Sequence, residues 1–287
     1  MRRIIAVIFT LFTVFSVFNA TGQSYFTAIE MGFSGGASQY FGDLNEHYGL
    51  KSINGAGGLY ARKRMNAYIA IKTEINFTNV GYKDSYNTDP FDKERNLSFN
   101  SSILEGAIEA EFNFFGFITG DKTHRYTPYL LGGIGAFTFD PYTTYNGQKY
   151  YLQPLGTEGQ NAGYSDRKYS SVAACFPIGV GVKYWIKGGI NLTMEIADRL
   201  TSTDYLDDVS ATYVGLDKFP ANSVAAALQD RSNHVNNPTN TLGEAGKQRG
   251  NTSSYDQYML AIVSISFNFK TYKCPQSQGF DDQMRVR

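Results

Sequence analysis

The sequence predicts an all-β chain, an eight-stranded antiparallel transmembrane β-barrel of up-and-down topology and of the outer-membrane type. Three observations predict this fold. The chain of 287 residues is rich in Tyr, Phe and Gly (21, 21 and 29) and has a modest mean hydropathy of −0.30, as expected for strands with one polar face. Eight segments alternate between apolar and polar residues. Short and long connections alternate along the chain, which is typical of such barrels.

Residues 1–22 have the layout of a secretory signal peptide, so we expect export from the cytoplasm. Two arginines precede an apolar run over 4–18, and the small residues Ala20 and Gly22 follow. Cleavage is expected after Gly22 or, alternatively, after Ala20. The other interpretation is an N-terminal membrane anchor, for which the run is short because a helical span needs about 20 residues.

The strands are predicted from period-2 alternation within residues 23–270. In 102–114, for example, Leu104 shares one face with Phe112 while Glu105 and Glu109 lie on the other. Since successive side chains of a strand point to opposite faces, we expect the apolar face to meet lipid and the polar face to line the interior. The segment after 125 alternates poorly, so its facing is not predicted. In chain order the strands are expected at 25–40, 53–62, 67–80, 102–114, 126–139, 171–186, 191–203 and a last segment ending near 269.

The connections orient the barrel, because outer-membrane barrels have short periplasmic turns and long outer loops. The short connections are near 63–66, 116–124 and 187–189, and the long ones are 42–52, 81–96, 140–170 and 204–254. We therefore expect a periplasmic tail at 271–287 and both termini in the periplasm.

Charged residues fall on the inward face. Both signs are present, and an eight-stranded barrel is only wide enough for side chains to fill, so we expect an ion-paired interior rather than a pore. A proton or substrate path is the sharper alternative. The residues assigned to this network are Glu30, Arg62, Lys72, Glu74, Glu105, Glu109, Glu111, Lys183, Glu195 and Arg199.

Aromatic residues are predicted to mark the two membrane boundaries. One girdle is expected at the periplasmic strand ends and one at the outer ends. The first comprises Tyr25, Tyr126, Tyr184 and Trp185, and the second Tyr40, Tyr82, Tyr142 and Tyr258.

Two further features suggest binding sites. Cys175 faces the lumen, a membrane width away from Cys274, so an internal disulfide is not expected. The Cys274–Pro275 segment of the tail is therefore a candidate partner contact, with Cys274 either bridged to a periplasmic partner or a free thiol. At the outer ends, clustered carboxylates are candidate Ca²⁺ ligands or, alternatively, turn caps. These carboxylates belong to Asp43, Asp204, Asp207 and Asp208.

Several stretches carry a resemblance to a known family. They are 35–44 (GGASQYFGDL), 96–99 (NLSF), 111–114 (EFNF), 127–130 (TPYL), 153–160 (QPLGTEGQ), 177–184 (PIGVGVKY) and 195–210 (EIADRLTSTDYLDDVS). In this order the chain resembles a family of Bacteroidetes outer-membrane barrels typified by the PorG component of type IX secretion. The resemblance implies a subunit of the secretion and gliding machinery. It also implies contact with a periplasmic ring made of a lipoprotein and its partner subunit. We expect no cofactor.

Other functional classes remain as alternatives. Basic and acidic residues balance at 26 each, which argues against nucleic-acid binding. His47, His124 and His234 are the only histidines, and no nucleophile motif accompanies them, so we do not expect an enzyme. The remaining alternative is a standalone small barrel like OmpW or OmpX, either a conduit for small apolar molecules or a surface adhesin using the loop 215–254.

Overall fold

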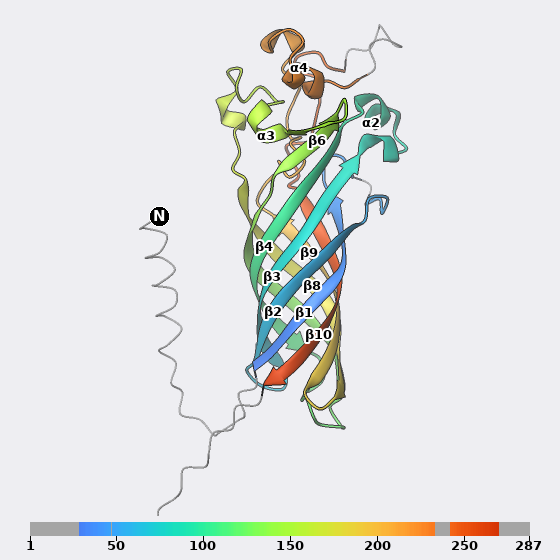
Figure 1. Cartoon of the computed structure of the whole chain (residues 1–287), viewed down its shortest axis with the longest axis vertical. Helices are drawn as coiled ribbons and strands as arrows, with labels where there is room; N and C mark the ends of the chain where they lie inside the picture. The colour runs from blue at the N-terminus through green and yellow to red at the C-terminus, as the bar shows by residue number, and fades with distance from the viewer. Residues whose placement is uncertain (1–28, 47, 233–241, 270–287) are drawn as a thin grey trace, which may run out of the picture. The chain divides into compact units, whose positions relative to one another are not determined.

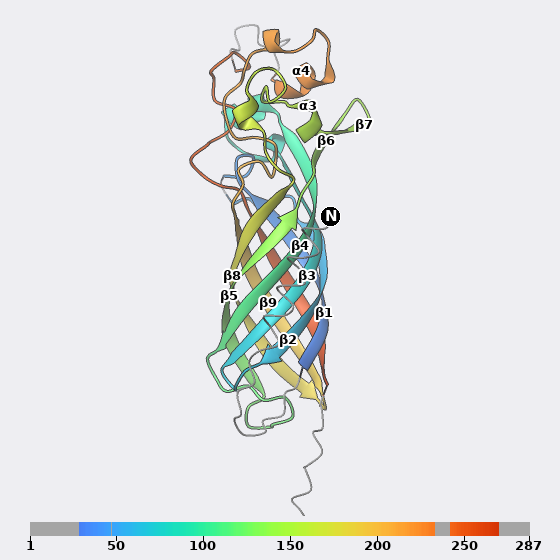
Figure 2. The ribbon, with the colours of Figure 1, turned by 90° about the vertical axis from the view of Figure 1, so that its left-hand side faces the viewer.

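The fold is a closed antiparallel β-barrel, which confirms the fold class that the sequence predicts. The computed structural model describes residues 29–46, 48–232 and 242–269. Its eight long strands are β1 (Ile29–Phe41), β2 (Asn54–Arg64), β3 (Ile69–Lys83), β4 (Ser98–Asn113), β5 (Tyr126–Thr138), β8 (Val172–Lys187), β9 (Ile190–Thr201) and β10 (Gln257–Phe269). Each pairs with the next in this order, and β10 pairs with β1 to close the sheet (Figures 1 and 2).

The barrel exposes apolar side chains and buries charged ones. On β4, Leu104, Ile108 and Phe112 are 44–51% exposed, whereas Glu105 and Glu109 are at most 1% exposed. A water-soluble domain has the opposite arrangement. This distribution is that of an outer-membrane-type barrel, in which the outer surface meets lipid and all backbone groups pair within the closed sheet.

Two strands run past the limits that the sequence predicts. β3 continues to Lys83 and β4 begins at Ser98, so the two pair beyond the other strands. The facing of β5, which the sequence leaves open, is also resolved. Tyr129 and Leu131 point inward while Leu130 is exposed, so apolar residues occupy both faces here and hide the alternation.

The connection between β5 and β8 contains a hairpin that the sequence analysis missed. Its strands are β6 (Pro141–Tyr145) and β7 (Gln148–Tyr151), and β6 also pairs with β4. The turn residues Asn146 and Gly147 both have positive φ (50° and 78°). The Asn-Gly pair is a strong hairpin signal because these residues tolerate that conformation.

In the part of the chain that the structure describes, short helices lie only in the connections. They are the 3₁₀ turns η1 (Asp84–Tyr86), η2 (Ser165–Arg167) and η3 (Leu216–Lys218), and the α-helices α2 (Pro90–Arg95), α3 (Leu152–Leu155) and α4 (Val224–Gln229). Across 29–46, 48–232 and 242–269, no helix is long and apolar enough to cross a membrane. The labelled helices gather at one end of the barrel (Figure 1). We call it the long-loop end, and the end with 65–68, 114–125 and 188–189 the short-turn end.

The predicted aromatic girdles need a correction at the long-loop end. Tyr126 and Tyr184 are exposed near the short-turn end, as expected, and Tyr25 lies outside the described residues. However, Tyr40, Tyr82 and Tyr258 are almost fully buried. They occupy inward-facing strand positions, where they pack inside the mouth of the barrel instead of facing the membrane boundary.

Candidate functional site

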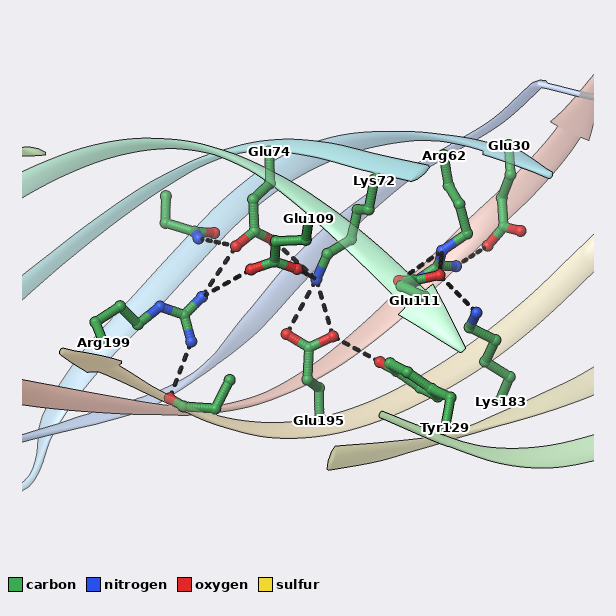
Figure 3. A network of polar contacts seen from close by, with 12 residues as sticks. Glu30, Arg62, Lys72, Glu74, Glu109, Glu111, Tyr129, Lys183, Glu195 and Arg199 are labelled. Atoms are coloured by element: carbon green, nitrogen blue, oxygen red, sulfur yellow. Dashed lines mark hydrogen bonds and ion pairs between the residues drawn. The ribbon is translucent and has the colours of Figure 1, made fainter. Parts of the chain in front are cut away.

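The ten charged residues that the sequence assigns to the interior are all buried there. Four of them form a group toward the short-turn end (Figure 3). Arg62 places Nη1 2.5 Å from Glu30 and Nε 2.8 Å from Glu111, and Lys183 places Nζ 2.6 Å from Glu111. Because β8 supplies Lys183, β4 supplies Glu111 and only β5 lies between these strands, this contact spans one strand along the inner wall.

Lys72 is the centre of the second group (Figure 3). Its ammonium lies 3.1 Å from Glu74, 2.7 Å from Glu109 and 2.8 Å from Glu195. These three are the one carboxylate trio, within the part of the chain that the structure describes, whose oxygens converge closely enough to hold a metal ion. The Lys72 ammonium supplies the positive charge at this point.

Arg199 extends the second group toward the long-loop end. It contacts Glu74 at 2.9 Å and Glu105 at 3.3 Å. Tyr258 donates a hydrogen bond of 2.5 Å to Glu105. The contact between Arg199 on β9 and Glu74 on β3 joins opposite walls, as the Lys72–Glu195 contact does.

These contacts explain why so many charges tolerate burial. A buried charge is costly unless it is paired and hydrogen-bonded, and the six glutamates face four basic side chains. Tyrosine hydroxyls compensate further, as where Tyr129 donates to Glu195 at 2.6 Å. Since an eight-stranded barrel has room only for side chains, the cross-lumen ion pairs form a plug.

Above the plug, the mouth of the barrel is packed with aromatic rings. The Tyr40 and Phe99 ring centroids are 4.7 Å apart, and those of Phe137 and Tyr258 are 5.5 Å apart, both edge to face. This geometry is favourable for aromatic pairs. The interior therefore changes from charged to aromatic toward the long-loop end.

The long connections fold over this mouth as an ordered cap, which we define as 42–46, 84–97, 139–171, 202–232 and 242–256. Arg95, at the end of α2, is one of its ties. It makes two 2.8 Å bonds to Asp84 and donates to the carbonyl oxygens of Asp43 and Arg249. A single buried guanidinium thus joins three of the long connections.

Arg249 is the second tie of the cap. It lies 2.9 Å from Glu158 and donates to the carbonyl oxygen of Asp208 at 2.7 Å. Glu158 in turn accepts hydrogen bonds from the backbone N–H groups of Ser210 and Ala211. Of these residues, only Asp208 was assigned a role from the sequence, because their partners are far away in the chain.

The four candidate Ca²⁺ ligands are all buried at the long-loop end. Asp208 accepts from Tyr169 and Thr157, and its pKa rises to about 6 through burial. Asp43 accepts from the backbone N–H of Asn251, and burial followed by repulsion from Asp207 raises its pKa. These oxygens already have protein donors, as turn caps do.

Asp207 and Asp204 also lie at the mouth, where the structure adds a residue that the sequence analysis missed. Burial raises the pKa of Asp207 to about 8 and that of Asp204 to about 7. Asp256, directly before β10, joins them, and its pKa is also raised by burial and then by Asp207. Asp256 directly precedes β10, and Asp43 follows the neighbouring end of β1. This position at a strand end could have identified Asp256 as a mouth residue from the sequence.

The remaining sequence-based candidates lie elsewhere. His124 is in a short-turn connection, where its Nδ1 lies 2.8 Å from the exposed Asp121. Cys175 is fully buried inside the barrel. The signal peptide, His47, His234 and the tail with Cys274 and Pro275 lie outside the described residues.

Comparisons with known proteins give a family and several distant structures. A family described as "Domain of unknown function (DUF6089)" matches residues 2–219. No curated protein matches the chain. The crystal structure of Neisserial surface protein A is 10% identical, covering 84% of this chain and 97% of that one at a TM-score of 0.41.

Two further solved structures match this chain with similar sequence identity, coverage and TM-score. The N-terminal β-barrel domain of Pseudomonas aeruginosa OprF is 9% identical, covering 85% of this chain and 98% of its own at a TM-score of 0.36. Ail, the attachment invasion locus protein of Yersinia pestis, is 8% identical, covering 85% and 100% at a TM-score of 0.40. The strand pairing of this chain itself shows the closed barrel.

Proposed function

For this chain, which belongs to the DUF6089 family, we propose a non-enzymatic role as an integral outer-membrane component of the type IX protein secretion and gliding machinery. In this role it docks a periplasmic ring complex to the outer membrane. The observation that carries the proposal is the plugged interior, because a lumen crossed by buried ion pairs is suited to anchoring rather than to conduction. Both termini are proposed to lie in the periplasm.

The resemblance that the sequence analysis found supports the same role. The stretch 153–160 contains Glu158, which holds the cap, and 195–210 contains Arg199, which belongs to the plug. Two of the stretches therefore contain residues that close the barrel. A shared plug and cap are consistent with a shared structural role.

The proposed partners are the ring lipoprotein and its partner subunit, which would meet the short-turn end and the tail 271–287. Cys274 is the proposed bridge to one of them. On non-reducing gels of native membranes, wild type is expected to show a reducible species of higher mass that Cys274→Ser removes. Cys175→Ser is the matched control, since that thiol is buried in the barrel. If wild type shows no such species, there is no bridge.

Affinity purification from native outer membranes with mass spectrometry tests the main proposal. The full chain should recover ring and translocon subunits, and a chain ending at Phe269 should recover fewer of them if the tail is the contact. Recovery of the barrel alone from the full chain contradicts the secretion role and favours a standalone barrel.

One observation favours the alternative of a conduit for small apolar molecules. Between Gly132–Ile178 and Gly135–Cys175 the pairing of β5 with β8 lacks two residue pairs while the register stays the same, so this is a local gap in the hydrogen bonding. Pro177 lies in this gap and has no N–H to donate. If the gap is a lateral exit, wild type should admit an apolar dye into vesicles faster than Pro177→Val. Equal rates would leave the conduit without support.

A further inference from the structure

Three side chains meet at the mouth of the barrel in an arrangement that the anchoring role does not require. The Tyr40 hydroxyl oxygen lies 2.6 Å from Asp207 Oδ2 and 2.8 Å from Asp256 Oδ1. All three residues are at most 1% exposed. We call them the mouth triad.

The proton count of the mouth triad is informative. A phenol hydroxyl has one proton and donates one hydrogen bond, whereas an ionised carboxylate only accepts. Two contacts this short therefore need a second proton, carried by one carboxyl group and donated to the Tyr40 oxygen. Without the second proton, the Tyr40 oxygen and one carboxylate oxygen would lie at hydrogen-bond distance with no hydrogen between them.

The backbone fixes which carboxyl oxygens face Tyr40. The N–H of Val209 donates to Asp207 Oδ1 at 2.9 Å, and the N–H of Leu206 donates to Asp256 Oδ2 at 2.9 Å. The remaining oxygen of each carboxyl group points to the tyrosine. The second proton thus resides on Asp207 Oδ2 or Asp256 Oδ1.

The triad also joins separate parts of the chain. Tyr40 is near the end of β1, Asp207 follows β9, and Asp256 precedes β10. We infer that one carboxyl proton held in the mouth triad locks the cap segments 202–232 and 242–256 onto the ends of β1 and β10, and that losing this proton loosens them. This inference is independent of the proposed secretion role.

The surrounding charges favour retention of the proton at neutral pH. Asp43 after β1 and Asp204 after β9 are both acidic and raise the pKa of Asp256, after burial and Asp207. Arg95 on α2 lowers that of Asp207, but it is engaged by Asp84. Burial dominates, and the pKa of Asp207 is about 8.

The direction of the pH dependence follows from linkage. A free Asp has a pKa near 4, so the triad carboxyl gains protons on closure. Its contribution to closure is complete below about pH 4 and is lost as the pH rises toward 8. One linked proton changes the closed-to-open ratio by about tenfold per pH unit in that window.

Hydrogen exchange of the full chain in lipid vesicles, followed by mass spectrometry from pH 5 to 9, tests the lock. After correction for intrinsic exchange rates, protection of 202–232 and 242–256 should fall by at least about tenfold per unit up to about pH 8, of which the triad contributes about one proton. In Asp207→Asn or Asp256→Asn the amide donates permanently to Tyr40. Either change should therefore lower the number of protons released on cap opening, which the pH slope of protection measures, by about one. Asp217→Asn, at an exposed site, should leave it unchanged.

Several results would overturn the inference. One is a wild-type slope near zero, and another is an unchanged slope in a folded Asn variant. Heat-dependent gel mobility establishes folding, and either Asn variant alone suffices if the other does not fold. Restoration of closure at pH 9 by 1 mM Ca²⁺, with no pH dependence in EDTA, would assign the lock to a cation instead of a proton.

Discussion

Replacing Lys72 by Met should destabilise the barrel by about 3 kcal/mol at pH 7. The ammonium lies within 3.1 Å of Glu74, Glu109 and Glu195, and breaking a buried ion pair costs about 3–5 kcal/mol. We expect the lower end of this energy range because Glu74 still has an ion-pair partner in Arg199, at 2.9 Å. Glu109 loses the most electrostatic stabilisation, because its other basic neighbour, Arg199, is 3.8 Å away.

The assay is reversible guanidinium unfolding in lipid vesicles. A change of about 3 kcal/mol lowers the folding equilibrium constant by roughly a hundredfold or more. The double variant Lys72→Met/Glu109→Gln should recover at least about 1 kcal/mol by removing the unpaired charge. Lys122→Met, in an exposed turn, is the control. A loss below about 1 kcal/mol for Lys72→Met, or no recovery in the double variant, would refute the ion-paired plug as a source of stability.

Two further changes test the cap and the packing. Arg95→Met should expose the cap to proteases while leaving the strands resistant, because the guanidinium holds Asp84 and two backbone carbonyls; unchanged cleavage would contradict its role as a tie. Gly181→Ala should cost about 1–3 kcal/mol in the same unfolding assay, since an added Cβ would lie 2.5 Å from the Tyr129 ring. Gly132→Ala is the matched control, because its Cβ would meet nothing within 4 Å, and an equal loss in both variants would contradict the packing argument.

Period-2 alternation explains why the barrel and its interior could be predicted from the sequence. Strand faces are a local property, so Glu105 and Glu109 could be assigned inward from their neighbours alone. The same parity places Tyr40 on the face of Glu30, and applying it would have prevented the girdle error. An aromatic residue at a strand end can therefore be assigned to a membrane girdle only after the strand parity shows whether it faces lipid or the lumen.

The cap and the mouth triad could not be predicted in this way. Arg95 meets the carbonyl of Arg249, 154 residues away, and Tyr40 meets Asp256 at a separation of 216. Such contacts depend on the return path of irregular loops, for which the sequence has no period. The Asn146–Gly147 turn is different, because its local signal was present and unused.

Single-channel recording in planar bilayers at pH 7 tests the central claim most directly. The claim is that side chains plug the barrel. Pure, folded wild-type protein should insert without adding persistent conductance steps above the bare bilayer, because Lys72–Glu195 and Arg199–Glu74 ion pairs cross the lumen. Stable, reproducible steps from the folded chain would contradict the plug and, with it, the anchoring role.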